Sequence, residues 1–418
     1  SAASDVYKRQ ALQSSGAISL DDIHQEVDGV SGTTCSINDS DIRGLIDKGA
    51  GATMGFNEWY GASNTKYIAA TGGNTTTSGN YKYHYFNSSG TFNITQGPVN
   101  TPTAVDYIII AGGGAGGTSA TNQYNRMGGG GGAGGYITGT FTGNAGSRSI
   151  TVGGGAGAAP NSGNNGSNSS ISGVATATGG GGGGFSNSGW TSDGGNNGGS
   201  GGGGGMPAPY GSQSKGSGTS GQGHDGHLGY RSYQPGVSGL GAGGGGGGKG
   251  GAAQDYLSRV TAYQPHGLYS EARVSYAGGK GSTTGSANYN GASRAGGGGG
   301  GAYPGHGYYF WNNNPANPQY YDSYFRFPYG GRGRDQFNQP QNAYNSSASG
   351  GGVGHAYSNV NSPYDNPDRG SGIVQVAASG TANTGGGGGG GAHGNAAQNR
   401  QGGNGGSGIV MVRYQYQG

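Results

Sequence analysis

The chain has 418 residues, of which 107 are glycine, and only 9% are charged, against roughly a quarter in an ordinary soluble domain. Hydrophobic residues make up 30% of the chain, and the net charge is +3. The aliphatic side chains are too few to fill the core of a protein of this size, so the composition excludes an ordinary large globular enzyme. The sequence also lacks the Gly-X-Y repeat of collagen and an apolar run long enough to span a membrane. Cys35 is the single cysteine, which excludes an internal disulfide framework.

A high glycine content is also typical of disordered chains, but these stay open through high net charge and low hydrophobicity. Here the net charge is low and 10% of the residues are aromatic, which favours collapse. We therefore expect a mainly β and irregular fold. It would combine a bundle of polyglycine II-type helices with flanking short β-strands, long loops and a small α-helical N-terminal module.

The first 62 residues differ from the rest of the chain. Residues 1–10, SAASDVYKRQ, resemble a translated sequencing adapter and are left out of the fold reasoning. Residues 11–62 carry eight acidic and two basic side chains, a net charge of −6, whereas residues 63–418 carry +8. This break in charge predicts a module boundary.

Two capping-box patterns, which begin at Ser19 and Ser36, predict two short helices in this module, with Gly29 and Gly49 as plausible ends. Two such helices bury too little surface to be stable alone. Their apolar stripe would therefore pack on a partner, on a symmetry mate, or on the nearby aromatic residues 56, 59 and 60. As a candidate attachment surface we select Ile23, Val27, Ile42, Leu45 and Ile46.

Residues 63–110 are expected to open the main domain as β structure. Tyrosines alternate along 81–85, residues 87–90 form a turn, and 91–94 return as a second strand. Residues 105–110 form a continuous apolar strand, which is typical of a strand buried on both faces. The last apolar stretch, 408–414, should pair with 107–110. Further strands are expected at 135–138, 149–152, 174–178 and 372–376.

The glycine-rich domain, 111–418, is punctuated by glycine runs at 128–132, 179–184, 201–205, 243–248, 296–301 and 385–391. Such runs are too flexible for an α-helix and have no side chains for a sheet core. Their regular state is an extended helix with three residues per turn, whose outward amides need partners when buried. Rods packed side by side would supply these partners. We select as scaffold positions Gly130, Gly181, Gly203, Gly246, Gly298 and Gly388.

An aromatic insertion at 303–370 interrupts the glycine-rich pattern. Residues 303–364 hold 15 of the chain's 41 aromatic residues, among Asn, Ser, Gly, Pro and Arg. This composition is typical of binding loops that recognise varied surfaces, although the rings could instead fold under as small cores that cap the bundle. The candidate receptor-binding residues are Tyr308, Tyr309, Phe310, Trp311, Tyr320, Tyr321, Tyr324, Phe325, Arg326 and Tyr329.

Motifs for catalysis and cofactors do not fit their required context. GxGxxG patterns recur, but no helix former follows a glycine run, and Lys249 is followed by glycine instead of the Ser or Thr of a phosphate loop. His224 and His227 lack further metal ligands nearby, and the Arg-Gly pattern at 331–334 occurs once. We therefore expect no enzymatic activity, no cofactor, no bound metal, no nucleic-acid partner and no membrane insertion.

Three stretches combine a strand with glycines: SSGTFNI at 88–94, DYIIIAGGG at 106–114, and GGSGIV at 405–410. On these stretches, about residues 84–414 resemble the glycine-rich domain of phage tail-fibre and adhesin proteins. Residues 37–42 and 54–60 also resemble N-terminal segments of marine phage structural proteins. The resemblance implies a virion component at the tail tip, with glycine helices packed in a sandwich and host receptors bound by the loops between them.

Two functions from different classes follow from these features. In the first, the protein is a phage tail-fibre adhesin, made in the host cytoplasm without a signal peptide. It binds a bacterial surface protein or glycan, contacts other tail or fibre proteins through the N-terminal module, and could form a homo-oligomer. In the alternative, it is a cellular glycine-rich matrix protein that self-assembles outside the cell. The matrix protein would require an export route, and it would not need long Tyr loops of irregular sequence.

Overall fold

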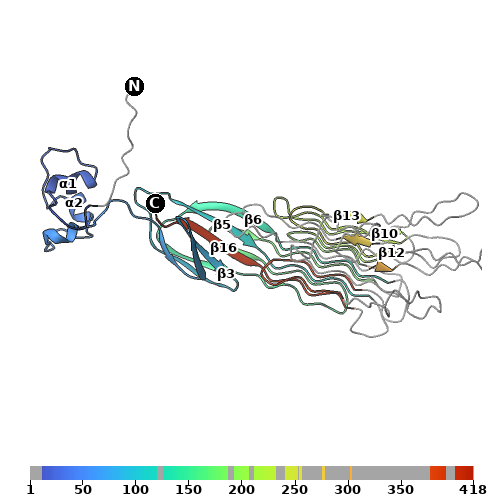
Figure 1. Cartoon of the computed structure of the whole chain (residues 1–418). Coiled ribbons are helices and arrows are strands. Elements are labelled where there is room, and N and C mark those ends of the chain that lie inside the picture. The colour runs from blue at the N-terminus through green and yellow to red at the C-terminus, as the bar shows by residue number, and fades with distance from the viewer. Residues whose placement is uncertain are drawn as a thin grey trace, which may run out of the picture.

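The computed structural model describes residues 12–119, 126–186, 193–206, 211–231, 241–252, 254–256, 275–277, 302–303, 377–391 and 401–417. Three parts follow one another along the molecule (Figure 1): a small helical module, a pair of β-sheets, and a region of nearly parallel glycine-rich segments. Within the described residues, no helix is long and apolar enough to cross a membrane. The glycine run 296–301 and the expected strand at 372–376 lie outside the described residues.

The helical module contains α1 (Leu20–Glu26), α2 (Ser40–Gly44) and a 3₁₀ turn, η1 (Phe56–Trp59). The predicted first capping box is confirmed, since the Asp22 amide donates to Ser19 Oγ and the Ser19 amide donates to the Asp22 carboxylate. The second prediction is wrong in position. Asp39 occupies the N-cap of α2, and its carboxylate instead accepts from the Ser36 amide in the preceding turn.

After each helix, the residue in the left-handed conformation is an aspartate instead of the predicted glycine. Asp28 has φ +69° and Asp47 has φ +55°, the left-handed conformation that closes a helix C-terminus. The next amide in each case, that of Gly29 or Lys48, donates back to a carbonyl of the last helical turn. Aspartate tolerates this conformation better than most residues, so glycine is not required there.

Two antiparallel five-stranded sheets pack against each other, so the mainly β prediction is confirmed. The first sheet has the order β1 (Ala69–Thr71), β4 (Gly90–Gln96), β7 (Gly146–Thr151), β8 (Ser169–Ile171) and β9 (Ala175–Ala177). The second has the order β2 (Asn74–Ser78), β3 (Tyr81–Phe86), β16 (Ile409–Gln415), β5 (Ala104–Ile110) and β6 (Tyr136–Thr142).

The predicted pairing of the last strand is confirmed. β16 lies antiparallel to β5, with Ile409 opposite Ile110 and Val412 opposite Tyr107. Its other edge pairs with β3, so β16 occupies the centre of the second sheet. The expected second strand at 91–94 is confirmed as part of β4, which lies in the other sheet and does not pair with β3. Both edges of β3 are taken by β2 and β16, so β4 crosses to the other layer and buries Phe92 and Ile94 between the sheets.

The predicted two-sided burial of β5 is also confirmed. Val105, Tyr107 and Ile109 point into the core between the two sheets, together with Phe86, Phe92, Ile94, Ile150, Val410, Val412 and Tyr414. Ile108 and Ile110 lie on the opposite face with Tyr83, Tyr136 and Met411, where they form a second cluster. The sheets therefore hold most of the large apolar side chains of the described main domain.

Short strands lie farther from the helical module. β10 (Gly211–Gln213), β11 (Gly229–Arg231), β12 (Gly241–Ala242) and β15 (Ala302–Tyr303) form a four-stranded sheet, while β13 (Gln254–Tyr256) pairs with β14 (Ser275–Ala277). They lie near the end of the glycine-rich region that faces away from the helices (Figure 1).

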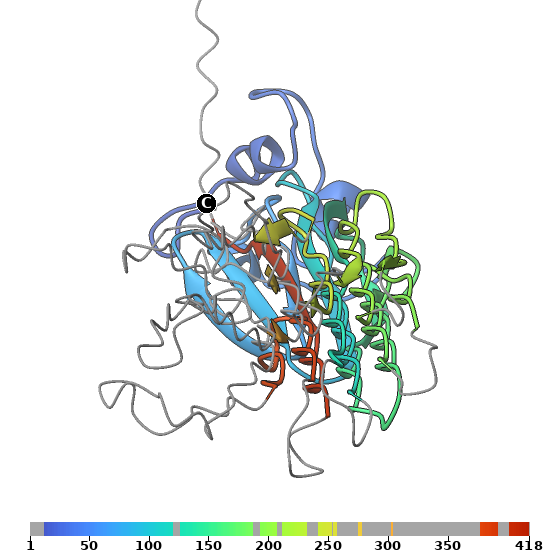
Figure 2. The same ribbon diagram turned by 90° about the vertical axis from the view of Figure 1, so that its right-hand side faces the viewer.

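Hydrogen bonds between the glycine-rich segments repeat every three residues. After β5, the amides of residues 112, 115 and 118 donate to the carbonyls of 167, 164 and 161. Those of 113 and 116 donate to 406 and 403, and those of 114 and 117 donate to 132 and 129. One segment thus bonds three neighbours in rotation. Viewed along their length, the segments lie side by side as separate coils (Figure 2).

Candidate functional site

The ten candidate receptor-binding residues, from Tyr308 to Tyr329, lie outside the described residues, so their role stays a prediction. The nearest described residues on either side of this insertion form backbone contacts with the glycine-rich region. Tyr303 pairs with Gly241 between β15 and β12, and the Ala378 carbonyl accepts from the Gly389 amide. Both ends of the insertion are therefore anchored in the glycine-rich region.

Hydrogen bonds join several points at which the described chain breaks off. Ser119 forms a bridge with Ser186, and its hydroxyl donates to the Arg126 carbonyl at 2.7 Å. The Ser186 hydroxyl donates to the Met206 carbonyl at 2.9 Å, and the Met206 amide donates to the Met127 carbonyl at 2.8 Å. The Gly128 amide then reaches the Gly391 carbonyl. We call this set the distal layer: Ser119, Arg126, Met127, Ser186, Met206 and Gly391.

The distal layer is closed to solvent. The side chains of Ser119, Met127, Ser186 and Met206 are at most 1% exposed, and Arg126 is 5% exposed. Segments 120–125, 187–192, 207–210 and 392–400 each begin directly after a member of this layer or end directly before one. None of these residues is among the candidates that the sequence pattern predicted. Met127 directly precedes one glycine run and Met206 directly follows another. A large apolar residue next to a glycine run is the signal that could have identified them as buried residues at the ends of the rods.

The scaffold glycines lie where no side chain fits. A Cβ atom added at Gly181, Gly203, Gly246 or Gly388 would come within 3.0 Å of a carbonyl oxygen on a neighbouring segment, closer than real Cβ atoms approach. Gly130 donates to the Gly244 carbonyl and accepts from the Gly203 amide, each at 2.8 Å. Gly298 lies outside the described residues. The described positions therefore agree with the requirement for glycine, which is set by close backbone approach.

The candidate attachment residues lie in the module's own core. Ile23 and Ile42 are fully buried, Leu45 is 7% exposed, and Val27 and Ile46 pack against them. Trp59 completes this cluster, and its Nε1 donates to the Ile42 carbonyl. The stripe thus packs on the nearby aromatic residue, one of the three alternatives. Ile23, Ile42 and Leu45 are buried in this core, whereas Val27 and Ile46 are partly exposed, and the role of the five residues in attachment stays a prediction.

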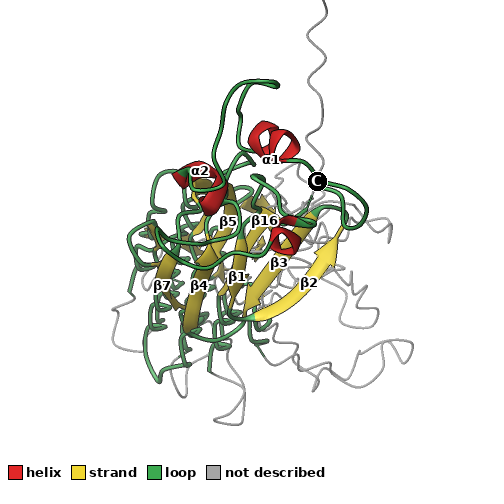
Figure 3. Cartoon of the chain, turned by 90° about the vertical axis from the view of Figure 1, so that its left-hand side faces the viewer, coloured by secondary structure: helices red, strands yellow, loops and turns green. Residues whose placement is uncertain are grey.

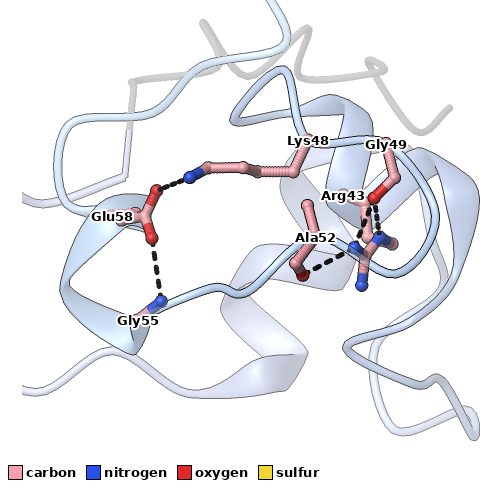
Figure 4. Close-up of polar contacts among 6 residues, drawn as sticks. All are labelled: Arg43, Lys48, Gly49, Ala52, Gly55 and Glu58. Carbon is pink, nitrogen blue, oxygen red and sulfur yellow. Dashed lines mark hydrogen bonds and ion pairs between the residues drawn. The ribbon is translucent and has the colours of Figure 1, made fainter.

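Polar contacts fix the loops around this core (Figure 4). The buried Arg43 guanidinium donates to the carbonyls of Gly49 and Ala52, and also to Asn38 Oδ1 at 2.8 Å. Lys48 Nζ lies 2.8 Å from the Glu58 carboxylate. Hydrogen bonds from Lys48 and from the Gly55 amide lower the pKa of Glu58. These charged groups hold the module's turns together.

A buried histidine joins the two sheets. His84 Nδ1 lies 2.6 Å from the Gly72 carbonyl, and Nε2 lies 3.2 Å from the Tyr414 hydroxyl, which accepts from the Ala70 amide. Its ring stacks on Tyr414 and meets Phe92 edge-on. Burial lowers the pKa of His84 and raises that of Tyr414 to about 12, so both groups are neutral near pH 7. The pair is enclosed in the core and has no room for a substrate.

The described residues contain no group of three or more His, Cys, Asp or Glu side chains that could hold a metal ion. Asp225, between the two histidines considered above, instead accepts from the Gly218 amide and forms an ion pair with Lys215 at 3.0 Å. These contacts lower the pKa of Asp225 and tie two loops of the glycine-rich region together.

Comparison with known proteins gives one match. The glycine-rich domain family matches residues 86–319, which is more than half of the chain and begins at the end of β3. No curated protein and no solved structure matches the chain. The matched region includes the strands β4 to β15 and most of the glycine runs. The chain therefore belongs to the glycine-rich domain family.

Proposed function

We propose that the glycine-rich region is a bundle of polyglycine II-type helices that serves as a rigid scaffold. The three-residue period of its hydrogen bonds supports this. In an extended helix with three residues per turn, residues i and i+3 face the same neighbour. The glycine positions support it as well, because only a backbone without Cβ atoms lets rods approach closely enough to share these bonds.

On this scaffold, we infer, the protein acts as a phage tail fibre or tail-tip adhesin that binds a bacterial surface protein or glycan through Tyr-rich loops. The observation that carries the inference is the distal layer. Its hydrogen bonds join the points at which four further segments of the chain begin or end. Binding residues generally lie on loops that a rigid framework positions, and Tyr with Arg or Trp supplies large contact areas.

The helical module would then face the virion, where it would dock to other tail or fibre proteins. Its net charge of −6 contrasts with +8 in the rest of the chain, and the positive part suits an anionic cell envelope. Its apolar stripe is buried, so docking would use the exposed side chains of Val30, Phe56 and Tyr60, which are 70%, 43% and 38% exposed.

A self-assembling matrix protein remains the alternative function. The same rods would serve it, since backbone amides at an outer rod can bond another molecule. The long irregular segment with 15 aromatic residues favours the adhesin, because a repetitive matrix needs no such insertion.

The test compares binding of the full chain to candidate host cells with that of two variants. In the first, Tyr320, Tyr321 and Tyr324 are changed to serine, and in the matched control Tyr60→Ser changes one exposed tyrosine on the helical module. The adhesin predicts saturable binding by the full chain and the control, and loss of binding by the first variant with an unchanged thermal melt. Equal binding by all three proteins, or sedimentation of the pure chain as fibres, would favour the matrix alternative.

A further inference from the structure

The outer strand β2 is an unusually open sheet edge. All five of its residues, Asn74 to Ser78, are exposed, and Figure 3 shows β2 as the outermost strand on its side of the sheet. Its pairing with β3 is regular, without a bulge. Natural proteins protect such edges with charges, proline, bulges or very short strands, because an open edge pairs with other chains. β2, with the sequence NTTTS, has none of these protections.

The other edges of the two sheets differ from β2. β1 and β9 have three residues each, and the register of β1 shifts between Ala69 and Ala70. At β6, the Tyr136 amide donates to the Gln222 carbonyl, and Tyr136 is buried while the residues after it alternate between partly buried and exposed. Among the described edge strands of the sandwich, β2 is therefore the one whose residues are all exposed.

The geometry of the β2–β3 hairpin determines which amides point outward. Ser78 and Tyr81 flank the two-residue turn of Gly79 and Asn80, where Gly79 has φ +55°. They form the hydrogen-bonded pair next to such a turn, and hydrogen-bonded pairs then recur at every second residue. Thr76 thus bonds to β3, whereas Thr75 and Thr77 direct their N–H and C=O groups away from the sheet.

We propose that β2 pairs antiparallel with β2 of a second copy of this chain, so that one sheet runs through a two-fold dimer. Thr76 then lies opposite the partner's Thr76. Thr75 forms a hydrogen-bonded pair with the partner's Thr77, and Thr77 forms the equivalent pair with the partner's Thr75. In this arrangement the outward N–H and C=O groups of Thr75 and Thr77, four on each copy, are all hydrogen-bonded. Such a self-complementary contact is the pattern that a two-fold axis requires.

Charge also favours a second copy as the occupant of this edge. β2 contains no charged residue, and the nearest one, Lys82, is on β3 opposite Thr77. In the dimer the two Lys82 side chains are separated by three strand spacings, about 14 Å. This exceeds the screening length of about 8 Å at physiological salt, so like charges do not oppose the contact. The Thr side chains that face each other form favourable cross-strand pairs.

The first test measures self-association of the full chain by sedimentation over a range of concentrations. Thr77→Pro removes one outward amide per copy and leaves the bonds to β3 intact. We expect the wild type to form dimers and the variant to dissociate about tenfold more readily or worse, because two of the four interfacial hydrogen bonds are lost. The control, Thr140→Lys, changes an exposed threonine on the opposite edge strand, β6, and should leave the dimer unchanged.

A charge-exchange experiment tests the two-fold register. Thr76→Lys and Thr76→Glu should each be monomeric, since like charges would lie opposite each other, and an equimolar mixture should restore a dimer of one copy of each. At concentrations low enough for the wild type to be monomeric, the thermal melt of each variant should match that of the wild type, because Thr76 is exposed. A wild type that is monomeric at its highest soluble concentration would overturn the proposal. A dimer that persists in Thr77→Pro or in the single Thr76 variants would also overturn it. The same holds if Thr140→Lys loses the dimer to the same extent, or if the mixture of Thr76→Lys and Thr76→Glu stays monomeric.

Discussion

The two halves of the main domain are stabilised in opposite ways. The sheets bury large side chains such as Phe92, Ile109 and Tyr414 between two layers, so apolar contact area holds them together. The glycine-rich segments bury hardly any side chain and are held by amides that bond three neighbours in rotation. A side-chain core can relax around a smaller residue, whereas a lattice of backbones in direct contact has no room for a larger one.

The largest expected effect is therefore a substitution that adds atoms to the lattice. Gly246→Val places a side chain against the Gly131 carbonyl, and we expect loss of soluble folding or destabilisation beyond about 3 kcal/mol, since overpacking alone costs about 1–3 kcal/mol. Chemical denaturation and soluble yield measure this. Gly157→Ala is the matched control, because a Cβ there meets no atom within 4 Å. A normal melt for Gly246→Val would refute the close-packed lattice.

Removal of a side chain from the sheets should destabilise the protein without loss of soluble folding. Phe92 is fully buried and touches Phe86, His84 and Tyr414, so Phe92→Ala should lower the free energy of unfolding by about 3–5 kcal/mol. Phe92→Leu should retain much of this stability. Phe56→Ala, at a half-exposed ring of the helical module, is the control and should have little effect. If Phe92→Ala and Gly246→Val were equally mild, the contrast between the two regions would fail.

Acid should weaken the sheets more than the lattice. The pKa of His84 is lowered in the folded state by burial, with Lys82 as a smaller cause, so the unfolded chain takes up the proton first as the pH falls. Stability from neutral His84 is thus complete above the ordinary pKa of about 6.5 and declines as the pH falls below it. Thermal melts at pH 8 and pH 5.5 measure this loss. His84→Gln should remove it, and His227→Gln, in the glycine-rich region, should retain it.

The smallest effect is expected in the helical module. Ser19→Ala removes the hydroxyl that accepts from the Asp22 amide at the start of α1, and N-cap losses of this kind cost about 1 kcal/mol. Far-ultraviolet circular dichroism with denaturant titration measures it. Ser15→Ala, in the exposed chain ahead of the helix, serves as the control. A loss as large as that of Phe92→Ala would mean that the module and the sheets unfold as one unit.

Local sequence patterns predicted several elements because their causes are local. Ser19 and Asp22 are three residues apart and cap a helix wherever they occur before an apolar stripe. The run 107–110 is apolar at successive positions, which predicts burial on both faces, and its match with 408–414 predicts their pairing. By contrast, nothing in the local sequence distinguishes a hairpin after residue 86 from a crossing to the other sheet.

The sequence by itself determined that long glycine runs need close backbone partners, because an extended helix without internal hydrogen bonds must bond outward. It also determined that the terminal apolar strand needs a neighbour. Only the tertiary structure decided which neighbours they find: β16 between β3 and β5, the 112–118 segment beside three others, and Ser119 joined to Ser186. The physical reason is that glycine carries no side chain to encode a register, so partner choice depends on the sheets from which the rods extend.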